Sequence, residues 1–285
     1  MICWELIQVL EMESDAEAFL RAFHARHAGA TAQTMGAGRT REGLSSYELL
    51  ARVVPPTPAP VTVVDLACGD GYLLEQVRAR DLPNARLIGI DMSPEELAAA
   101  RRRLGSGVEL LLERAQRLPL PDRSVDYLLC HMALMLMDDV EAVVREIGRV
   151  LTPGGVCCAV VGGDLPTEGA YADFLAILRD SLARRGDPPL ALGDPRTQSA
   201  AGLAALFAQA GFAAPVEVEE VVLHLDGPAG HVWHFLSSTY WSALLSAEEW
   251  QGIDRQVMAR LAGSSRDDGT VPCPLGLRLC SARQE

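Results

Sequence analysis

The residues best suited to ligand chemistry lie in "VVDLACGDGY" (residues 63–72). An apolar run ends at Asp65, and the tight sequence Gly69-Asp70-Gly71 follows it. Glycine-rich turns between a strand and a helix expose backbone N–H groups, and the helix N-terminus attracts negative charge. The stretch therefore predicts a site for a nucleotide-like ligand at this turn.

The turn lacks the features of two common phosphate sites. A dinucleotide-binding turn needs G-x-G-x-x-G, and the last position of that frame is Leu74 here. A P-loop needs Gly-Lys followed by Ser or Thr, which the turn does not contain. Asp65 and Asp70 would repel a phosphate but attract an ammonium group. We therefore expect a ligand with an amino-acid end.

A further acid lies where the next strand should end. The segment "ARLIGID" (85–91) predicts a strand ending at Asp91, and a carboxylate at such a position accepts hydrogen bonds from ribose hydroxyls. An amino acid joined to a nucleoside describes S-adenosylmethionine (SAM). The alternative, in which Gly69 and Gly71 only close a strand–helix bend, leaves Asp91 unexplained.

The elements that position these residues alternate regularly between strand and helix. Expected strands cover residues 61–67, 85–91, 108–113, 125–131, 156–163, 216–225 and 275–283. The alternation predicts an α/β fold with a doubly wound, mostly parallel, seven-stranded Rossmann-like sheet. Ligands of such sheets bind at the carboxyl ends of the strands, where Asp65 and Asp91 fall. In the helix expected at 93–104, Ser93 should be the N-cap and Glu96 should complete a capping box.

The Pro-rich stretch "PPTPAP" (55–60) is the clearest boundary in the chain. It predicts an N-terminal helical lid over residues 1–60 and a core over 61–285, with helical cap insertions around 164–197 and 228–265. Within the lid, Ser14 should cap a first helix, and the Gly/Thr-rich segment 28–43 should separate it from a second.

Composition excludes several classes of protein. A net charge of −13 over 285 residues disfavours a dedicated nucleic-acid binder, and no apolar run is long enough for a membrane span. The N-terminus is acidic and lacks a basic leader, and the seven Cys form no C-x-x-C pair. We therefore expect a cytoplasmic protein with reduced thiols and no bound metal.

Residues 61–163 resemble the class I SAM-dependent methyltransferases, in the branch of small-molecule enzymes. The resemblance rests on "VVDLACGDGY", "LIGIDMSPEEL", "LPLPDRSVDYLLCHMALMLMDD" and "REIGRVLTPGG". It implies that Asp91 binds the ribose and that Met92 lies against the adenine. It also implies a cofactor-binding turn made by Asp65, Ala67, Gly69 and Gly71, with Ala67 where Gly is commoner.

One position departs from the family pattern. Relatives often have an acid just before the "LPLP" stretch that bonds the adenine amino group, and this chain has Arg114 there, followed by Ala115 and Gln116. Adenine recognition is therefore expected from backbone groups and Gln116. The segment "GRTREGLSSYELL" (38–50) resembles the lid of natural-product methyltransferases and implies that Tyr47 closes over the cofactor.

Methyl transfer needs positioning and, for a hydroxyl acceptor, a general base. His131, at the end of the fourth expected strand, is the first candidate base and also lies beside the cofactor site. A packed histidine that only shapes the pocket is an equal alternative. His234, in the aromatic segment "GHVWHFLSSTYW" (230–241), is the second candidate, although interior packing explains it as well.

An apolar acceptor site is expected from the cap. Trp233, Phe235, Tyr240 and Trp241, with "MALMLM" (132–137), suit a bulky hydrophobic small molecule. The leading hypothesis is O-methylation in secondary, polyketide-like metabolism such as antibiotic biosynthesis. The alternatives are N- or C-methylation, a SAM-binding cyclase of pericyclase type on the same fold, and a non-catalytic SAM-binding protein.

Overall fold

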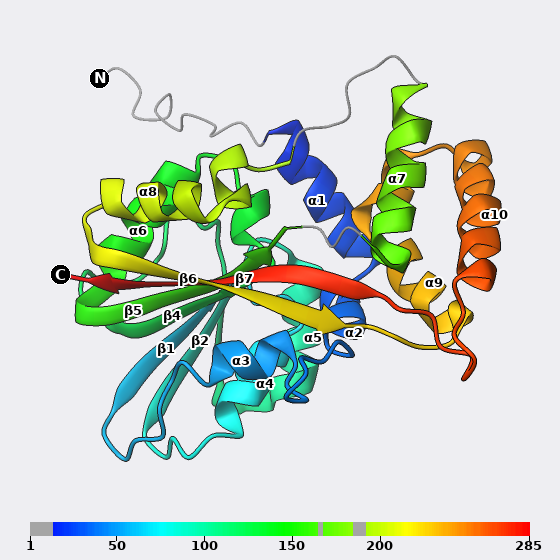
Figure 1. The fold of residues 1–285 in the computed structure, drawn as a ribbon. Helices are drawn as coiled ribbons and strands as arrows, with labels where there is room; N and C mark the ends of the chain where they lie inside the picture. The colour runs from blue at the N-terminus through cyan, green and yellow to red at the C-terminus, as the bar shows by residue number, and fades with distance from the viewer. Residues whose placement is uncertain (1–13, 165–167, 185–191) are drawn as a thin grey trace, which may run out of the picture.

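A single mixed sheet forms the centre of the molecule, and helices cover both of its faces (Figure 1). The computed structural model describes residues 14–164, 168–184 and 192–285. The strand order is β3-β2-β1-β4-β5-β7-β6, with β7 antiparallel to both β5 and β6 and the other pairs parallel. The strands are β1 (Val61–Leu66), β2 (Ala85–Asp91), β3 (Glu109–Leu112), β4 (Val125–His131), β5 (Leu151–Gly162), β6 (Phe212–His224) and β7 (Pro274–Gln284). The predicted seven-stranded Rossmann-like fold is confirmed.

Two hydrophobic cores lie on opposite faces of the sheet. Adjacent residues of β1 serve different cores: Val63 packs with α3 (Ser46–Ala51), α4 (Tyr72–Arg78) and α5 (Pro94–Leu104), and Val64 packs with α6 (Val140–Val150) and α8 (Ala200–Gln209). Both side chains are fully buried, as expected for a parallel strand covered on both faces. This burial fixes the strand ends that carry the predicted ligand residues.

In the described part of the N-terminal segment, two helices precede α3. Ser14 caps α1 (Asp15–Arg26) by accepting a hydrogen bond from the Glu17 backbone N–H, as predicted. A short helix, α2 (Ala30–Met35), lies inside the segment expected to be a break, so that expectation was wrong. Gly29, at φ 78°, provides the left-handed residue from which α2 starts.

Helices α7 (Ala170–Ala183), α9 (Ala229–Ser237) and α10 (Ala247–Gly263) gather on one side of the molecule (Figure 1). Their aromatic side chains pack mainly on one another. Trp233 stacks on Trp250 with ring centroids 5.5 Å apart, and Phe174 lies edge-on to both. Among the described residues, none of the helices is long and apolar enough to cross a membrane.

Candidate active site

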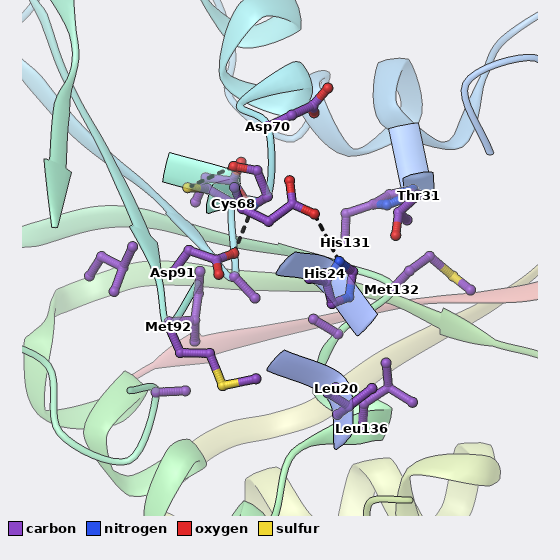
Figure 2. Close-up of a pocket in the computed structure, with 18 of the residues that line it drawn as sticks. Leu20, His24, Thr31, Cys68, Asp70, Asp91, Met92, His131, Met132 and Leu136 are labelled. Carbon is purple, nitrogen blue, oxygen red and sulfur yellow. Dashed lines mark hydrogen bonds and ion pairs between the residues drawn. The ribbon is translucent and has the colours of Figure 1, made fainter. Parts of the chain in front are cut away.

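A cavity of about 1020 Å³, including its open mouth, lies at the carboxyl ends of β1, β2 and β4 (Figure 2). Three kinds of segment line it: the strand ends and their turns, the segments 113–116 and 131–137, and the N-terminal helices. Of the predicted site residues, those in the lining are Tyr47, Asp65, Ala67, Gly69, Asp91, Met92, Ala115, Gln116 and His131.

The turn after β1 is left-handed at three positions. Ala67, Gly69 and Gly71 have φ of 58°, 52° and 79°. Gly71 is outside the lining, but its φ is one that other residues rarely adopt, and a Cβ there would lie 2.6 Å from the Leu104 side chain and 3.2 Å from Ala100 Cβ, so glycine favours the close approach of α4 to α5. Gly71 therefore shapes the turn rather than lining the cavity.

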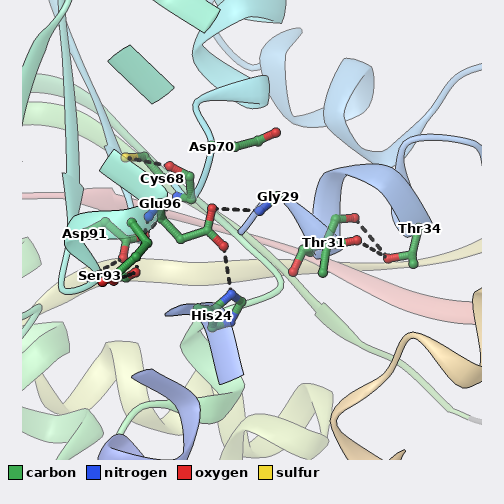
Figure 3. A network of polar contacts seen from close by, with 12 residues as sticks. His24, Gly29, Thr31, Thr34, Cys68, Asp70, Asp91, Ser93 and Glu96 are labelled. Atoms are coloured by element: carbon green, nitrogen blue, oxygen red, sulfur yellow. Dashed lines mark hydrogen bonds and ion pairs between the residues drawn. The ribbon is translucent and has the colours of Figure 1, made fainter. Parts of the chain in front are cut away.

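Asp91 holds this turn in place from the end of β2 (Figure 3). Its Oδ2 accepts a hydrogen bond of 2.8 Å from the Gly69 N–H, and its Oδ1 accepts one of 2.8 Å from the Ser93 N–H. Burial raises the pKa of Asp91, although these two backbone donors oppose the shift. Each carboxylate oxygen retains a lone pair for a ligand hydroxyl.

Glu96 does not complete the predicted capping box. Ser93 Oγ accepts from the Glu96 N–H at 3.2 Å, as expected, but the Ser93 N–H is already bound to Asp91. The Glu96 carboxylate instead contacts the lid: Oε1 lies 2.8 Å from His24 Nδ1, and Oε2 accepts from the Gly29 N–H at 2.9 Å (Figure 3). Glu96 therefore joins α5 to both N-terminal helices.

Asp65 is buried without a partner. It is 1% exposed, and neither carboxylate oxygen has a hydrogen-bond partner among the described residues. Burial raises its pKa well above the usual range, and the nearby Asp91 and Asp70 raise it further. A buried acid in this state is a site for a cation or a hydrogen-bond donor.

Asp70, the other acid of the turn, is already paired. Its Oδ2 lies 2.5 Å from an Arg103 guanidinium nitrogen, and Oδ1 accepts from the Tyr72 N–H at 3.3 Å. Both acids of the turn were expected to be available to an ammonium group. Because Asp70 is paired with Arg103, this expectation now applies to Asp65 alone.

Helix α1 packs over the segment that follows β3. Glu17 accepts hydrogen bonds of 2.8 and 2.6 Å from Arg114 and one of 3.2 Å from Gln116 Nε2. Gln116 Nε2 also donates to the Asp138 backbone carbonyl at 2.8 Å, and Ser14 Oγ donates to the Asp138 carboxylate. The lid is thus bonded to the wall where the adenine was expected.

His131 lies deep in the cavity at the end of β4. Its ring stacks on Tyr47 with centroids 3.7 Å apart, and Nε2 lies 2.9 Å from Ser46 Oγ. Nδ1 is buried and has no partner among the described residues. Burial lowers the pKa of His131 to about 3, and it raises the pKa of Tyr47 well above 10. Both side chains are therefore uncharged near neutral pH.

The structure does not bring His234 to the cavity. Helix α9 buries Val232, Phe235 and Leu236, so His231 and His234 lie exposed on its other side. Of the aromatic residues expected around the acceptor, Tyr240 lines the cavity, whereas Trp233, Phe235 and Trp241 pack in the core. Lining residues that the sequence did not reveal include Glu17, Leu20, His24, Thr31 and Glu96.

Comparison with known proteins agrees with this geometry. Residues 64–159 match the family described as "Methyltransferase domain". Residues 64–159 therefore form a methyltransferase domain, and the sheet has the class I methyltransferase fold. The predicted resemblance to SAM-dependent methyltransferases is confirmed for this domain, which contains the strand ends and turns described above.

The chain spans about half the length of the curated relatives that it matches. Trans-aconitate 2-methyltransferase from Methylobacterium nodulans is 37% identical over 147 residues, which are 50% of this chain and 51% of the relative. Demethylmenaquinone methyltransferase from Thermus thermophilus is 37% identical over 116 residues, 40% of this chain and 52% of the relative.

A solved structure shares the fold of the methyltransferase domain. Phosphoethanolamine N-methyltransferase 2 from Haemonchus contortus, in complex with phosphomonomethylethanolamine and S-adenosylhomocysteine, superposes with a TM-score of 0.56 at 15% identity. The match covers 95% of this chain and 60% of that one. At this identity, the likeness concerns the fold alone.

Proposed function

We propose that the protein is a SAM-dependent methyltransferase that methylates an oxygen atom of a hydrophobic small molecule. The observation that carries the proposal is Asp65, a buried carboxylate without a partner at the floor of a cavity in a methyltransferase domain. An ammonium group placed there would pair with it, and the amino-acid end of SAM provides one.

The cavity residues fit the rest of this cofactor. Asp91 would accept hydrogen bonds from the ribose hydroxyls, and Met92 and Ala115 would contact the adenine. Gly69, held by Asp91, keeps the turn close to the ligand. When bound, SAM supplies an electrophilic methyl group on a sulfonium.

The charge of the cavity indicates the class of acceptor. Its described lining includes the acids Glu17, Asp65, Asp70, Asp91, Glu96 and Glu113. The basic lining residues Arg114 and His24 contact Glu17 and Glu96, and Asp70 is paired with Arg103, so Asp65, Asp91 and Glu113 are the acids of the described lining without a basic side chain as partner. We expect them to disfavour a tricarboxylate such as trans-aconitate, whereas a neutral acceptor could pack on Tyr47, Met132 and Tyr240. We therefore favour an apolar, uncharged acceptor.

His131 is better suited to orienting the acceptor than to removing its proton. A base whose pKa is about 3 accepts a proton poorly from a hydroxyl near neutral pH. Its buried Nδ1 can instead form a hydrogen bond with the acceptor oxygen, while Nε2 remains with Ser46. This role favours an acceptor whose hydroxyl is acidic in its own right, such as a phenol or an enol.

Calorimetric titration of the wild type and Asp65→Asn with SAM, S-adenosylhomocysteine and NAD tests the cofactor. We expect the wild type to bind the first two and not NAD. The Asn variant should lose roughly thirty-fold or more in affinity, because it lacks the charge that pairs with the ammonium group. Binding of NAD alone, or undiminished binding of SAM by the variant, would contradict the proposal.

Incubation with SAM and a panel of phenols, amines and activated carbon acids tests the acceptor. Formation of S-adenosylhomocysteine with a methylated phenol supports O-methylation, and methylated nitrogen or carbon identifies the alternatives. Conversion of a substrate without S-adenosylhomocysteine formation would indicate the cyclase alternative. A cytoplasmic location and a role in secondary metabolism are part of the same proposal.

A further inference from the structure

We propose that Glu17, on lid helix α1, is the residue that recognises the exocyclic amino group of the cofactor's adenine, and that Arg114 holds it in position for that task. This inference rests on the proposed function, because it requires that the cavity binds SAM. It assigns to the lid a direct contact with the cofactor and a role in nucleobase specificity.

The place of Glu17 follows from its neighbours. Glu17 and Leu20 lie one turn apart on the same face of α1, and both line the cavity. Leu20 lines the cavity with Met92 and Leu136, and in the view of Figure 2 all three lie on the side away from Asp70. These apolar side chains suit the flat face of a purine, and a purine packed on Leu20 would have its edge within reach of Glu17, one turn away.

A purine amino group buried there needs an acceptor, because a buried N–H without a partner loses its hydrogen bond to water and gains none in return. Arg114 presents only donors and cannot meet that need. Glu17 can. Its side chain is 7% exposed, and a carboxylate has about four lone-pair directions. Among the described residues, Oε1 accepts from Arg114 and Gln116, whereas Oε2 accepts from Arg114 alone.

The contacts with Arg114 and Gln116 hold the Glu17 carboxylate in one orientation. Two contacts, of 2.8 and 2.6 Å, fix the carboxylate from one side, and Gln116 Nε2 holds Oε1 at 3.2 Å. An ionised carboxylate accepts stronger hydrogen bonds than a backbone carbonyl does. Arg114 therefore serves as a positioning residue. Relatives often have an acid at the position of Arg114, and here Glu17 of the lid supplies that acid instead.

The test compares binding of S-adenosylhomocysteine with binding of S-inosylhomocysteine, which has an oxo group in place of the amino group. We expect the wild type to prefer S-adenosylhomocysteine by about tenfold or more, because the oxo group faces a carboxylate and donates no hydrogen bond to it. In Glu17→Gln the ratio should fall to within about threefold, because an amide can donate or accept. Arg114→Ala should also lower the preference for S-adenosylhomocysteine over S-inosylhomocysteine.

Asp15→Asn is the matched control, because it removes the same charge from an exposed position of α1 and should keep the wild-type ratio. Equal weakening of both ligands in Glu17→Gln would overturn the inference, since it would assign Glu17 to lid closure alone. Loss of discrimination in Glu113→Gln, with Glu17→Gln unchanged, would also overturn it. If the wild type binds neither ligand, the proposed function fails; if it binds both equally, only this inference fails.

Discussion

The cavity floor and the lid seam hold their acids in different ways. The floor is defined as Asp65, Gly69 and Asp91. Asp91 accepts from backbone N–H groups, and Asp65 has no hydrogen-bond partner in the part of the chain that the structure describes. At the lid seam, defined as the pairs Glu17–Arg114 and His24–Glu96, each acid contacts a side chain from a distant part of the sequence.

The difference shows which part of the site is built into the sheet. The floor residues follow directly from strands buried on both faces, so their geometry does not depend on the lid. The lid seam exists only while α1 lies against the core. Partly exposed ion pairs contribute little to stability, so we expect the seam to open more easily than the floor.

The largest effect is expected on the floor at Asp91. Replacement Asp91→Ala leaves the Gly69 and Ser93 N–H groups without their acceptor, and we expect the free energy of unfolding to fall by about 3 kcal/mol. Urea denaturation measures this loss, and calorimetry should show that S-adenosylhomocysteine binding is lost as well. Asp91→Asn keeps one acceptor oxygen and should lose less. A fully stable alanine variant would show that the floor does not depend on Asp91.

Asp65→Asn should change stability in the opposite direction. Without ligand, we expect this variant to be more stable than the wild type at pH 8 by about 1–2 kcal/mol, because an unpartnered buried carboxylate is removed. The pKa of Asp65 is higher in the folded chain than in the unfolded chain. The wild type should therefore lose stability relative to the variant as the pH rises above the unfolded pKa, about 3.9. Thermal unfolding from pH 5 to pH 8 measures the trend, and a difference that shrinks with rising pH would refute it.

A smaller effect is expected at the seam. Glu96→Gln loses the charge that faces His24 but can keep the hydrogen bond from the Gly29 N–H. Hydrogen exchange of α1 amides should become about fivefold faster, equivalent to about 1 kcal/mol, while amides of β1 and β2 stay protected. Glu95→Gln, one residue away on the exposed side of α5, is the control. Faster exchange in the strands would mean that floor and seam are not separate.

The smallest effect is expected outside both regions. His234→Ala should keep acceptor-dependent formation of S-adenosylhomocysteine within about twofold of the wild type, because exposed positions tolerate substitution. His131→Ala should lower the rate by a larger factor, since His131 lines the cavity. The reverse order of the two variants would restore His234 as the candidate catalytic residue.

The floor could be predicted from the sequence because each of its residues ends a strand or forms the turn after it. Asp65, Gly69 and Asp91 are close to elements whose type the hydrophobic pattern determines. The seam could not, because Glu17 reaches Arg114 only through the packing of α1, which no local pattern specifies. The spacing of Ser93 and Glu96 predicted only a capping box, and it did not indicate the contacts of Glu96 with His24 and Gly29. His131 lines the cavity, but its lowered pKa depends on burial that the sequence did not reveal.

The seam also has a consequence for the timing of the reaction. Glu17, His24 and Thr31 form one wall of the cavity, and the seam pairs hold that wall against the core. In the proposed methyl transfer, a used cofactor leaves before a fresh one enters, and we expect the wall to part and re-form in each cycle. We expect the dwell time of S-adenosylhomocysteine behind the lid, rather than the transfer itself, to limit turnover. The N-terminal helices would then set the turnover rate of the proposed enzyme.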